Sequence, residues 1–300
     1  MNNDGMFPKD STEDILFNSL NEQGYLFQEA CKYELKRVDT GWSVKSSEYP
    51  VSIMEQNTKI DLVLEHQNTF AIVECKRADP IYKKWLFSEL EVNKRSSPMC
   101  QVLSLQTPSL ISSASPLDIK FSVEQKDFDV PTYIARTSIE VNCGSLSPRS
   151  GQNNQNILGL SRRSSSPQNI ENAFCQVLTG LSGFAKEQKD QSLRSHEGVK
   201  LFFIPIVVTT ASLYLAHYKA QDIDLSTGKI NRNKVVFGQN AHDLEQQNWV
   251  LVEYGVSNYT TPPSIPDNVV STDPHQLLKY KMRSIFVVNS THLTEFFKKL

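Results

Sequence analysis

The runs IDLVL (60–64) and AIVECK (71–76) decide the fold of this chain. Each run is apolar enough to form a buried strand, and the polar residues between them predict an antiparallel hairpin. In such a hairpin the start of one strand lies beside the end of the other, so Asp61 is expected close to Glu74 and Lys76. Glu74 and Lys76 are two residues apart and therefore share one face of their strand. We expect two carboxylates and one amine to converge at this point.

This set of side chains suits the hydrolysis of a phosphodiester bond. The reaction needs oxygen ligands that hold Mg²⁺, which polarises the phosphate and its water, and a cation that orients the nucleophile. Asp61 and Glu74 would be the carboxylate ligands, the main-chain carbonyl of Cys75 would complete the metal shell, and Lys76 would be the cation. The alternative is a salt bridge between Glu74 and Lys76 at a sheet edge, with Asp61 as a turn residue. Spacing alone leaves both interpretations open.

Composition excludes several other classes of protein. With 39% hydrophobic and 9% aromatic residues, the 300-residue chain can bury a large core, and its net charge of −2 gives no protein-wide attraction to nucleic acid. Its five cysteines are odd in number and contain no C-x-x-C pair, so neither a zinc ribbon nor a disulfide framework is expected. The longest apolar run, LFFIPIVV (201–208), is too short to span a membrane. We expect a cytoplasmic protein with reduced thiols, no signal peptide and no membrane partner.

The remaining pattern predicts a mixed α/β domain. Helices are expected over about 12–22, where Gly24 ends the first one, and over 25–37, 166–188 and from Thr291 onwards. Strands are expected at 42–51, 59–64, 69–76, 201–210, 212–218, 234–238, 249–255 and 284–289. The stretch at about 95–167 is rich in serine and predicts loops, around two strands at 118–125 and 131–142 that would pair as a hairpin.

The order of these motifs resembles the PD-(D/E)XK nuclease superfamily, which has the restriction-endonuclease-like fold. The resemblance rests on EYPV (48–51), IDLVL and AIVECKR (71–77), preceded by a helix that carries Glu29. It implies an αβββαβ core over about 25–92 and 168–218, with an insertion at about 95–167 and a C-terminal extension at about 219–300 in one nuclease domain. Ile60 stands where many members have a proline.

The resemblance also implies roles for single residues. Asp61 and Glu74 would bind the metal, Lys76 would be the catalytic lysine, and Glu29 would match an acid of the first helix. Glu34 and Glu13 compete with Glu29 for that last role.

A helical element also fits. Gln176-Val177-Leu178-Thr179-Gly180 resembles the Q-x-x-x-Y element of RecB-like members, although Gly180 replaces the tyrosine. Gln176 would hold the attacking water or a phosphate. The alternative is a polar residue on a solvated helix face.

Other candidate sites are weaker. The basic pairs Lys83-Lys84, Lys94-Arg95 and Arg162-Arg163 would meet phosphates, with Trp85 or Tyr82 stacking on a base, or would simply be solvated. The six histidines show no H-x-x-x-H spacing, and neither G-x-S-x-G nor G-x-x-x-x-G-K occurs, which argues against a zinc hydrolase, an α/β-hydrolase and a P-loop NTPase.

The sequence therefore predicts a nuclease that hydrolyses DNA phosphodiester bonds with Mg²⁺, for which Mn²⁺ would substitute. The resemblance suggests an endonuclease of restriction or phage defence. Because no DNA-reading motif is found, target selection would come from the insertion, a homodimer or a partner protein. The alternative is a catalytically inactive subunit of the same fold that binds nucleic acid or serves assembly.

Overall fold

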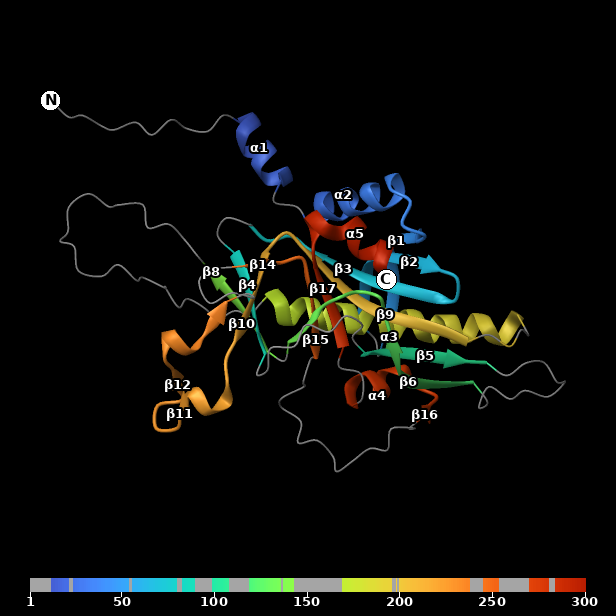
Figure 1. Ribbon diagram of the computed structural model, residues 1–300. Coiled ribbons are helices and arrows are strands. Elements are labelled where there is room, and N and C mark those ends of the chain that lie inside the picture. Colours follow the sequence, from blue (N-terminus) through green and yellow to red (C-terminus); the bar gives the residue numbers. More distant parts are fainter. Residues whose placement is uncertain are drawn as a thin grey trace.

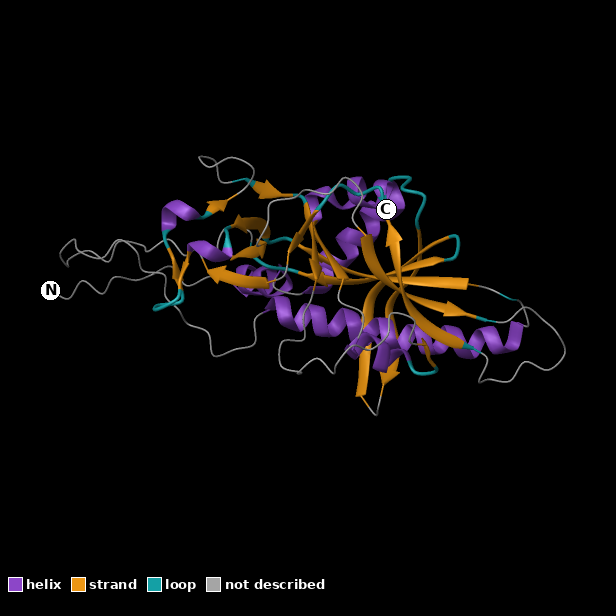
Figure 2. Ribbon diagram, turned by 60° about the horizontal axis from the view of Figure 1, so that its bottom comes forward, coloured by secondary structure: helices purple, strands orange, loops and turns teal. Residues whose placement is uncertain are grey.

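The computed structural model has mixed α/β architecture, built on one large sheet with helices on both faces (Figures 1 and 2). Of the 300 residues, the structure describes 12–21, 24–53, 56–79, 83–89, 99–107, 119–135, 137–142, 169–195, 198, 200–237, 245–253, 270–280 and 284–300. Among these residues, no helix is both long enough and apolar enough to cross a membrane.

The chain begins with two helices and a three-stranded antiparallel meander. The helices are α1 (Thr12–Asn21) and α2 (Gly24–Arg37), and the strands are β1 (Ser43–Ile53), β2 (Gln56–His66) and β3 (Thr69–Lys76). The expected helices and strands are confirmed, with β3 matching to the residue. The expectation for Gly24 was wrong, because this glycine is the first residue of α2.

The meander continues into a ten-stranded sheet whose central strands run parallel. β9 (Lys200–Thr209) lies beside β3 and parallel to it, and β17 (Ser284–Asn289) lies parallel to β9. The order across the sheet is β1-β2-β3-β9-β17-β15-β7, where β15 is Trp249–Glu253 and β7 is Tyr133–Ala135. Seven consecutive residues of β9, from Phe203 to Thr209, are buried, as expected for a strand covered on both faces.

Each face of the sheet has its own apolar core. On one face, α3 (Asn169–Ser195) and α4 (Pro274–Tyr280) pack over Val63, Ile72 and Val207. On the other face, α2 and α5 (Leu293–Lys299) pack over Leu62, Val73 and Val208. Figure 2 shows α3, the longest of the described helices, running across one face of the large sheet. The meander is therefore held between α2 and α3.

The serine-rich stretch adds strands to the sheets, and they do not form the hairpin that was expected. β6 (Lys120–Asp127) pairs with β5 (Met99–Gln106) and β16 (Val270–Ser271), while β5 also pairs with β9. β7 pairs with β15, and β8 (Thr137–Asn142) pairs with β4 (Lys83–Glu89). The hairpin expectation was wrong because β6 pairs with β5, the strand before it, while β7 and β8 pair with strands that are distant in sequence. Ser104, expected in a loop, is a fully buried residue of β5. The serine clusters at 96–97, 109–115 and 145–166 lie outside the described residues.

A second, smaller sheet is joined to the end of β9. β10 (Ser212–His217) follows β9 after two residues and lies between β4 and the short β13 (Val236–Phe237), with β14 (Gln246–Gln247) also paired to it. The short strands β11 (Ile223–Asp224) and β12 (Lys229–Ile230) form a projecting hairpin, next to the 3₁₀ turns Ala220–Asp222 and Arg232–Lys234.

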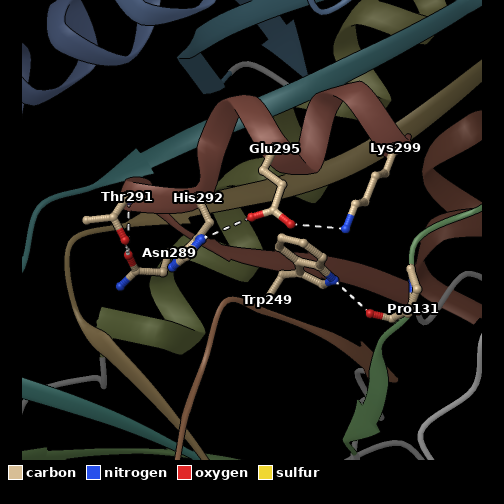
Figure 3. A network of polar contacts seen from close by, with 7 residues as sticks. All are labelled: Pro131, Trp249, Asn289, Thr291, His292, Glu295 and Lys299. Atoms are coloured by element: carbon tan, nitrogen blue, oxygen red, sulfur yellow. Dashed lines mark hydrogen bonds and ion pairs between the residues drawn. The ribbon is translucent and has the colours of Figure 1, made fainter.

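Polar contacts surround the end of β17 and the start of α5 (Figure 3). The buried Asn289, at the end of β17, accepts a hydrogen bond from the Thr291 main-chain N–H and donates one to the carbonyl of Ala211. It thereby caps the 3₁₀ turn Ser290–His292 and holds the β9–β10 turn. Nearby, Trp249 Nε1 donates to the carbonyl of Pro131 at 3.0 Å.

The closest approach of α3 to the sheet predicts a test of this packing. A Cβ atom added at Gly183 would lie 2.7 Å from Cβ of Val51, whose side chain is buried and has no room to move. We expect Gly183→Ala to destabilise the fold by about 1–3 kcal/mol, although alanine normally stabilises a helix interior by about 1 kcal/mol. Urea unfolding measures the difference.

The matched control is Gly24→Ala, where the added Cβ atom meets nothing within 4 Å. This variant should be as stable as the wild type or slightly more so. A Gly183→Ala protein that gains stability would contradict the packing described.

Candidate active site

The candidate site lies where the pairing of β2 and β3 stops. The ladder runs from His66 and Thr69 to Leu62 and Val73, and the next position along the two strands holds Asp61 and Glu74. There the carboxylate of Asp61 replaces a main-chain partner, because its Oδ2 accepts the N–H of Cys75 at 2.7 Å. The predicted convergence of Asp61 with the end of β3 is confirmed.

An irregularity in two strands sets the position of Asp61. Ile60 and Val63 both belong to the core under α3, although an odd spacing normally places residues on opposite faces. The alternation is therefore broken between them, at or next to Asp61. In β1 the residue at the same level is Glu48, which lies between the pairs of Ser47 with Leu62 and Tyr49 with Ile60 and has a φ of 50°. Such a φ is uncommon for a residue other than glycine, and nothing in the sequence indicated it.

Burial and mutual repulsion dominate the electrostatics of the two acids. Glu74 is only 7% exposed. Burial first, and then the charge of Asp61, raise the pKa of Glu74 to about 8, against the smaller opposing effect of Lys76. Burial also raises the pKa of Asp61, while the Cys75 N–H and Lys76 lower it and Glu48 raises it further. The pair is therefore costly to hold in its fully charged form without an added cation.

Lys76 and Gln176 complete the group on the side of α3. Lys76 ends β3, and its Nζ donates to Oε1 of Gln176 at 3.4 Å. The chain after Lys76 is pinned by Thr210, whose hydroxyl accepts the N–H of Ala78 at 2.7 Å and donates to the carbonyl of the same residue. Because Thr210 follows β9 directly, the carboxyl ends of β3 and β9 are tied together beside the site.

The close approach of α3 to β2 accounts for the glycine at position 180, where the resemblance implies a tyrosine. A Cβ atom at Gly180 would lie 2.8 Å from Cγ1 of Ile60. The helix therefore lies too close to β2 for an aromatic ring at this position, one turn after Gln176.

The two candidate acids of α2 each form an ion pair within that helix. Glu29 forms an ion pair with Lys32 at 2.9 Å, and its competitor Glu34 pairs with Arg37 at 2.7 Å. The α2 side chain that contacts the site is Gln28, which is 4% exposed and donates from Nε2 to the main-chain carbonyl of Asp61 at 2.9 Å. Its position on the same buried face as Cys31 and Leu35 was the available signal.

Cys75 takes part only through its main chain. Its side chain points into the core on the α2 side, where hydrogen bonding to Cys31 and burial raise its pKa well above the usual value. The thiol is therefore neutral and inert.

The donor set fits a hard divalent cation. Two carboxylates and the main-chain carbonyl of Cys75 offer oxygen ligands, which Mg²⁺ prefers. The raised pKa values of Asp61 and Glu74 mean that a cation between them would remove a real electrostatic cost. In the part of the chain that the structure describes, no group of three or more His, Cys, Asp or Glu side chains is arranged to hold a metal, so such a site would depend on this pair, the carbonyl and water.

One predicted base-stacking residue is excluded. Trp85 is fully buried, and its Nε1 donates to Glu140 at 3.2 Å. Lys83 also pairs with Glu140, and Lys84 donates to Ser212. Tyr82, Lys94-Arg95 and Arg162-Arg163 lie outside the described residues.

Comparison with known proteins adds no relative. No protein-family model matches the chain, and neither a curated protein nor a solved structure matches it.

The raised pKa of Glu74 predicts how stability varies with pH when divalent cations are absent. Glu74 binds its proton more tightly in the folded chain, at a pKa of about 8, than in the unfolded chain, at an ordinary value of about 4.3. Its contribution is therefore complete below pH ~4 and is lost as the pH rises to about 8. Each unit of difference between the two pKa values corresponds to about 1.4 kcal/mol, so the free energy of unfolding falls by a few kcal/mol over this range. Glu74→Gln cannot ionise and therefore avoids this fall.

Thermal unfolding in EDTA measures the effect. We expect Glu74→Gln to melt several degrees above the wild type at alkaline pH and close to it at mildly acidic pH. Glu171→Gln, at an exposed position in the first turn of α3, is the control and should show no such divergence. A constant difference between Glu74→Gln and wild type at every pH would contradict a raised pKa of Glu74.

Proposed function

We propose that this chain is a Mg²⁺-dependent nuclease of the PD-(D/E)XK superfamily, with a restriction-endonuclease-like core, and that it hydrolyses DNA phosphodiester bonds. The observation that carries the proposal is the side-by-side placement of the carboxylates of Asp61 and Glu74, with Lys76 at the same strand end. A binding surface for phosphates has no need of two adjacent acids, which repel phosphate unless a cation lies between them.

The arrangement of elements also supports the proposal. α2 leads into the antiparallel strands β1, β2 and β3, and the chain later returns through α3 to β9, which lies parallel to β3. This is the order αβββαβ that the resemblance implies. The catalytic group then sits at the carboxyl ends of parallel strands, where open α/β sheets usually bind their ligands.

Each residue of the group has a definable task. Asp61, Glu74 and the Cys75 carbonyl would hold Mg²⁺ or Mn²⁺, which when bound lowers the pKa of water and polarises the phosphate. Lys76 stabilises negative charge that develops at the phosphate, and its position is fixed because β3 is packed on both faces. Gln176, at the exposed rim of α3, offers an amide that orients water or a phosphate oxygen. Gln28 holds the main chain of Asp61 from the opposite side of the sheet.

Substitution of Lys76 and Asp61 tests the proposal. Lys76→Ala should reduce cleavage roughly 10²–10³-fold, since it removes one preorganised charge without disturbing the core. Asp61→Asn should be at least as damaging, although its amide oxygen still accepts the N–H of Cys75. The assay incubates purified protein with plasmid, linear duplex and single-stranded DNA in Mg²⁺ or Mn²⁺, with EDTA as a blank.

The matched control is Lys45→Ala. Lys45 lies on β1 and pairs with Glu65 near the far end of β2, so its loss should leave cleavage unchanged. Equal cleavage by the wild type and both site variants would assign the activity to a contaminant or another site. Binding of DNA without any cleavage, in either metal, would favour the inactive binding subunit instead.

A further inference from the structure

Large apolar side chains are exposed together on the two N-terminal helices. Of the ten large hydrophobic residues that are exposed in the described part of the chain, seven lie on α1 and α2. On α1 they are Ile15 (54%), Leu16 (65%), Phe17 (63%) and Leu20 (54%); on α2 they are Tyr25 (52%), Leu26 (36%) and Tyr33 (64%). We call these seven residues the α1–α2 surface. The other three are scattered over different strands and turns.

α1 is too short and too apolar to be a stable helix on its own in water. It is ten residues long, which is short for an isolated helix in water. At about 100° per residue, Ile15, Leu16, Phe17 and Leu20 spread over roughly 200° of its circumference. A helix that is apolar over so wide an arc is normally buried, yet α1 packs against α2 and otherwise projects from the body (Figure 1). We therefore expect another molecule to bind the α1–α2 surface and remove these side chains from water.

The charges of the two helices argue against an anionic membrane and a nucleic acid as the binding partner. α1 carries Glu13 and Asp14 in its first turn and has no lysine or arginine. An amphipathic helix that binds an anionic membrane is rich in basic residues on its polar face. A nucleic acid is not attracted either, because α1 and α2 together carry four acidic and three basic residues. A protein surface remains.

The area fits a stable protein interface. A half-exposed large side chain presents roughly 100 Å², so the seven together approach the roughly 800 Å² that each partner contributes to a standard interface. Three of the seven residues are aromatic, the type that contributes most to binding energy.

We propose that the α1–α2 surface is the interface through which two copies of this chain associate. The surface is complementary to itself, since α1 begins with Glu13 and Asp14 while α2 ends with Lys36 and Arg37. In a two-fold arrangement, α1 of one copy lies on α2 of the other and the reverse contact forms at the same time. Each acidic helix start then meets a basic helix end, and both apolar faces leave water. The inference is independent of the proposed function.

Light scattering on the full chain, coupled to gel filtration, tests the interface. The wild type should have twice the mass of one chain at micromolar concentration. The double substitution Leu16→Asp with Leu20→Asp should weaken association at least roughly a hundredfold and give the mass of one copy. Because both leucines are exposed in the single chain, the circular dichroism of the body should be unchanged. Leu225→Asp is the matched control: this leucine is fully exposed at the β11–β12 turn, and its variant should stay a dimer.

A charge exchange tests the proposed pairing of α1 with α2. Glu13→Lys and Lys36→Glu, both at exposed positions, should each weaken association roughly tenfold, and the combination should restore it. A wild type that has the mass of one chain overturns the proposal. The partner of the α1–α2 surface would then be a different protein. A dimer that survives the double leucine substitution overturns it as well. Failure of the combined charge variant to recover overturns the reciprocal arrangement.

Discussion

Electrostatic repulsion between two neighbouring carboxylates is the constraint around which this structure is built. No group in the part of the chain that the structure describes cancels it completely. Asp61 and Glu74 lie side by side where the β2–β3 ladder stops, and Glu74 is almost completely buried. The N–H of Cys75 and the charge of Lys76 stabilise the pair only in part, because the pKa of both acids stays raised. A sheet edge without a function would be more stable with neutral residues here. A divalent cation bound between the two carboxylates would relieve this repulsion, and this is the basis on which we propose a metal site here.

The surrounding fold holds the repelling pair in place. β3 lies between β2 and β9, with α3 over one face and α2 over the other. β2 and β3 therefore cannot move apart to separate Asp61 from Glu74. Thr210 pins the chain beyond Lys76 through Ala78, and Gln28 holds the main chain of Asp61 from the α2 side. Rigid support of this kind keeps charged groups within the small tolerance that catalysis needs. The apolar core thus contributes to the site as well as to stability.

The sequence predicted the central strands well, because their apolar runs are uninterrupted and end in polar turns. β3 and β17 match the expected residues, and the convergence of Asp61, Glu74 and Lys76 followed from strand geometry. The pairing of β7 with the distant β15 left no such local signal, and β4 was missed. β5 lies in the serine-rich stretch that predicted loops, so it was missed as the partner of β6. The contact of Gln28 with the main chain of Asp61 was not predicted, because the resemblance implies an acid on this helix and an amide gives no such signal.

Gly180 shows how the distance between α3 and β2 affects several residues of the site. α3 lies so close to β2 that a Cβ atom at position 180 would lie 2.8 Å from Ile60, and one at Gly183 would lie 2.7 Å from Val51. Larger residues at these two positions would push the helix outward. Gln176, one turn before Gly180, would then move away from Lys76, whose amine it contacts at 3.4 Å. The same close packing that leaves room only for glycine at position 180 therefore also brings Gln176 to Lys76.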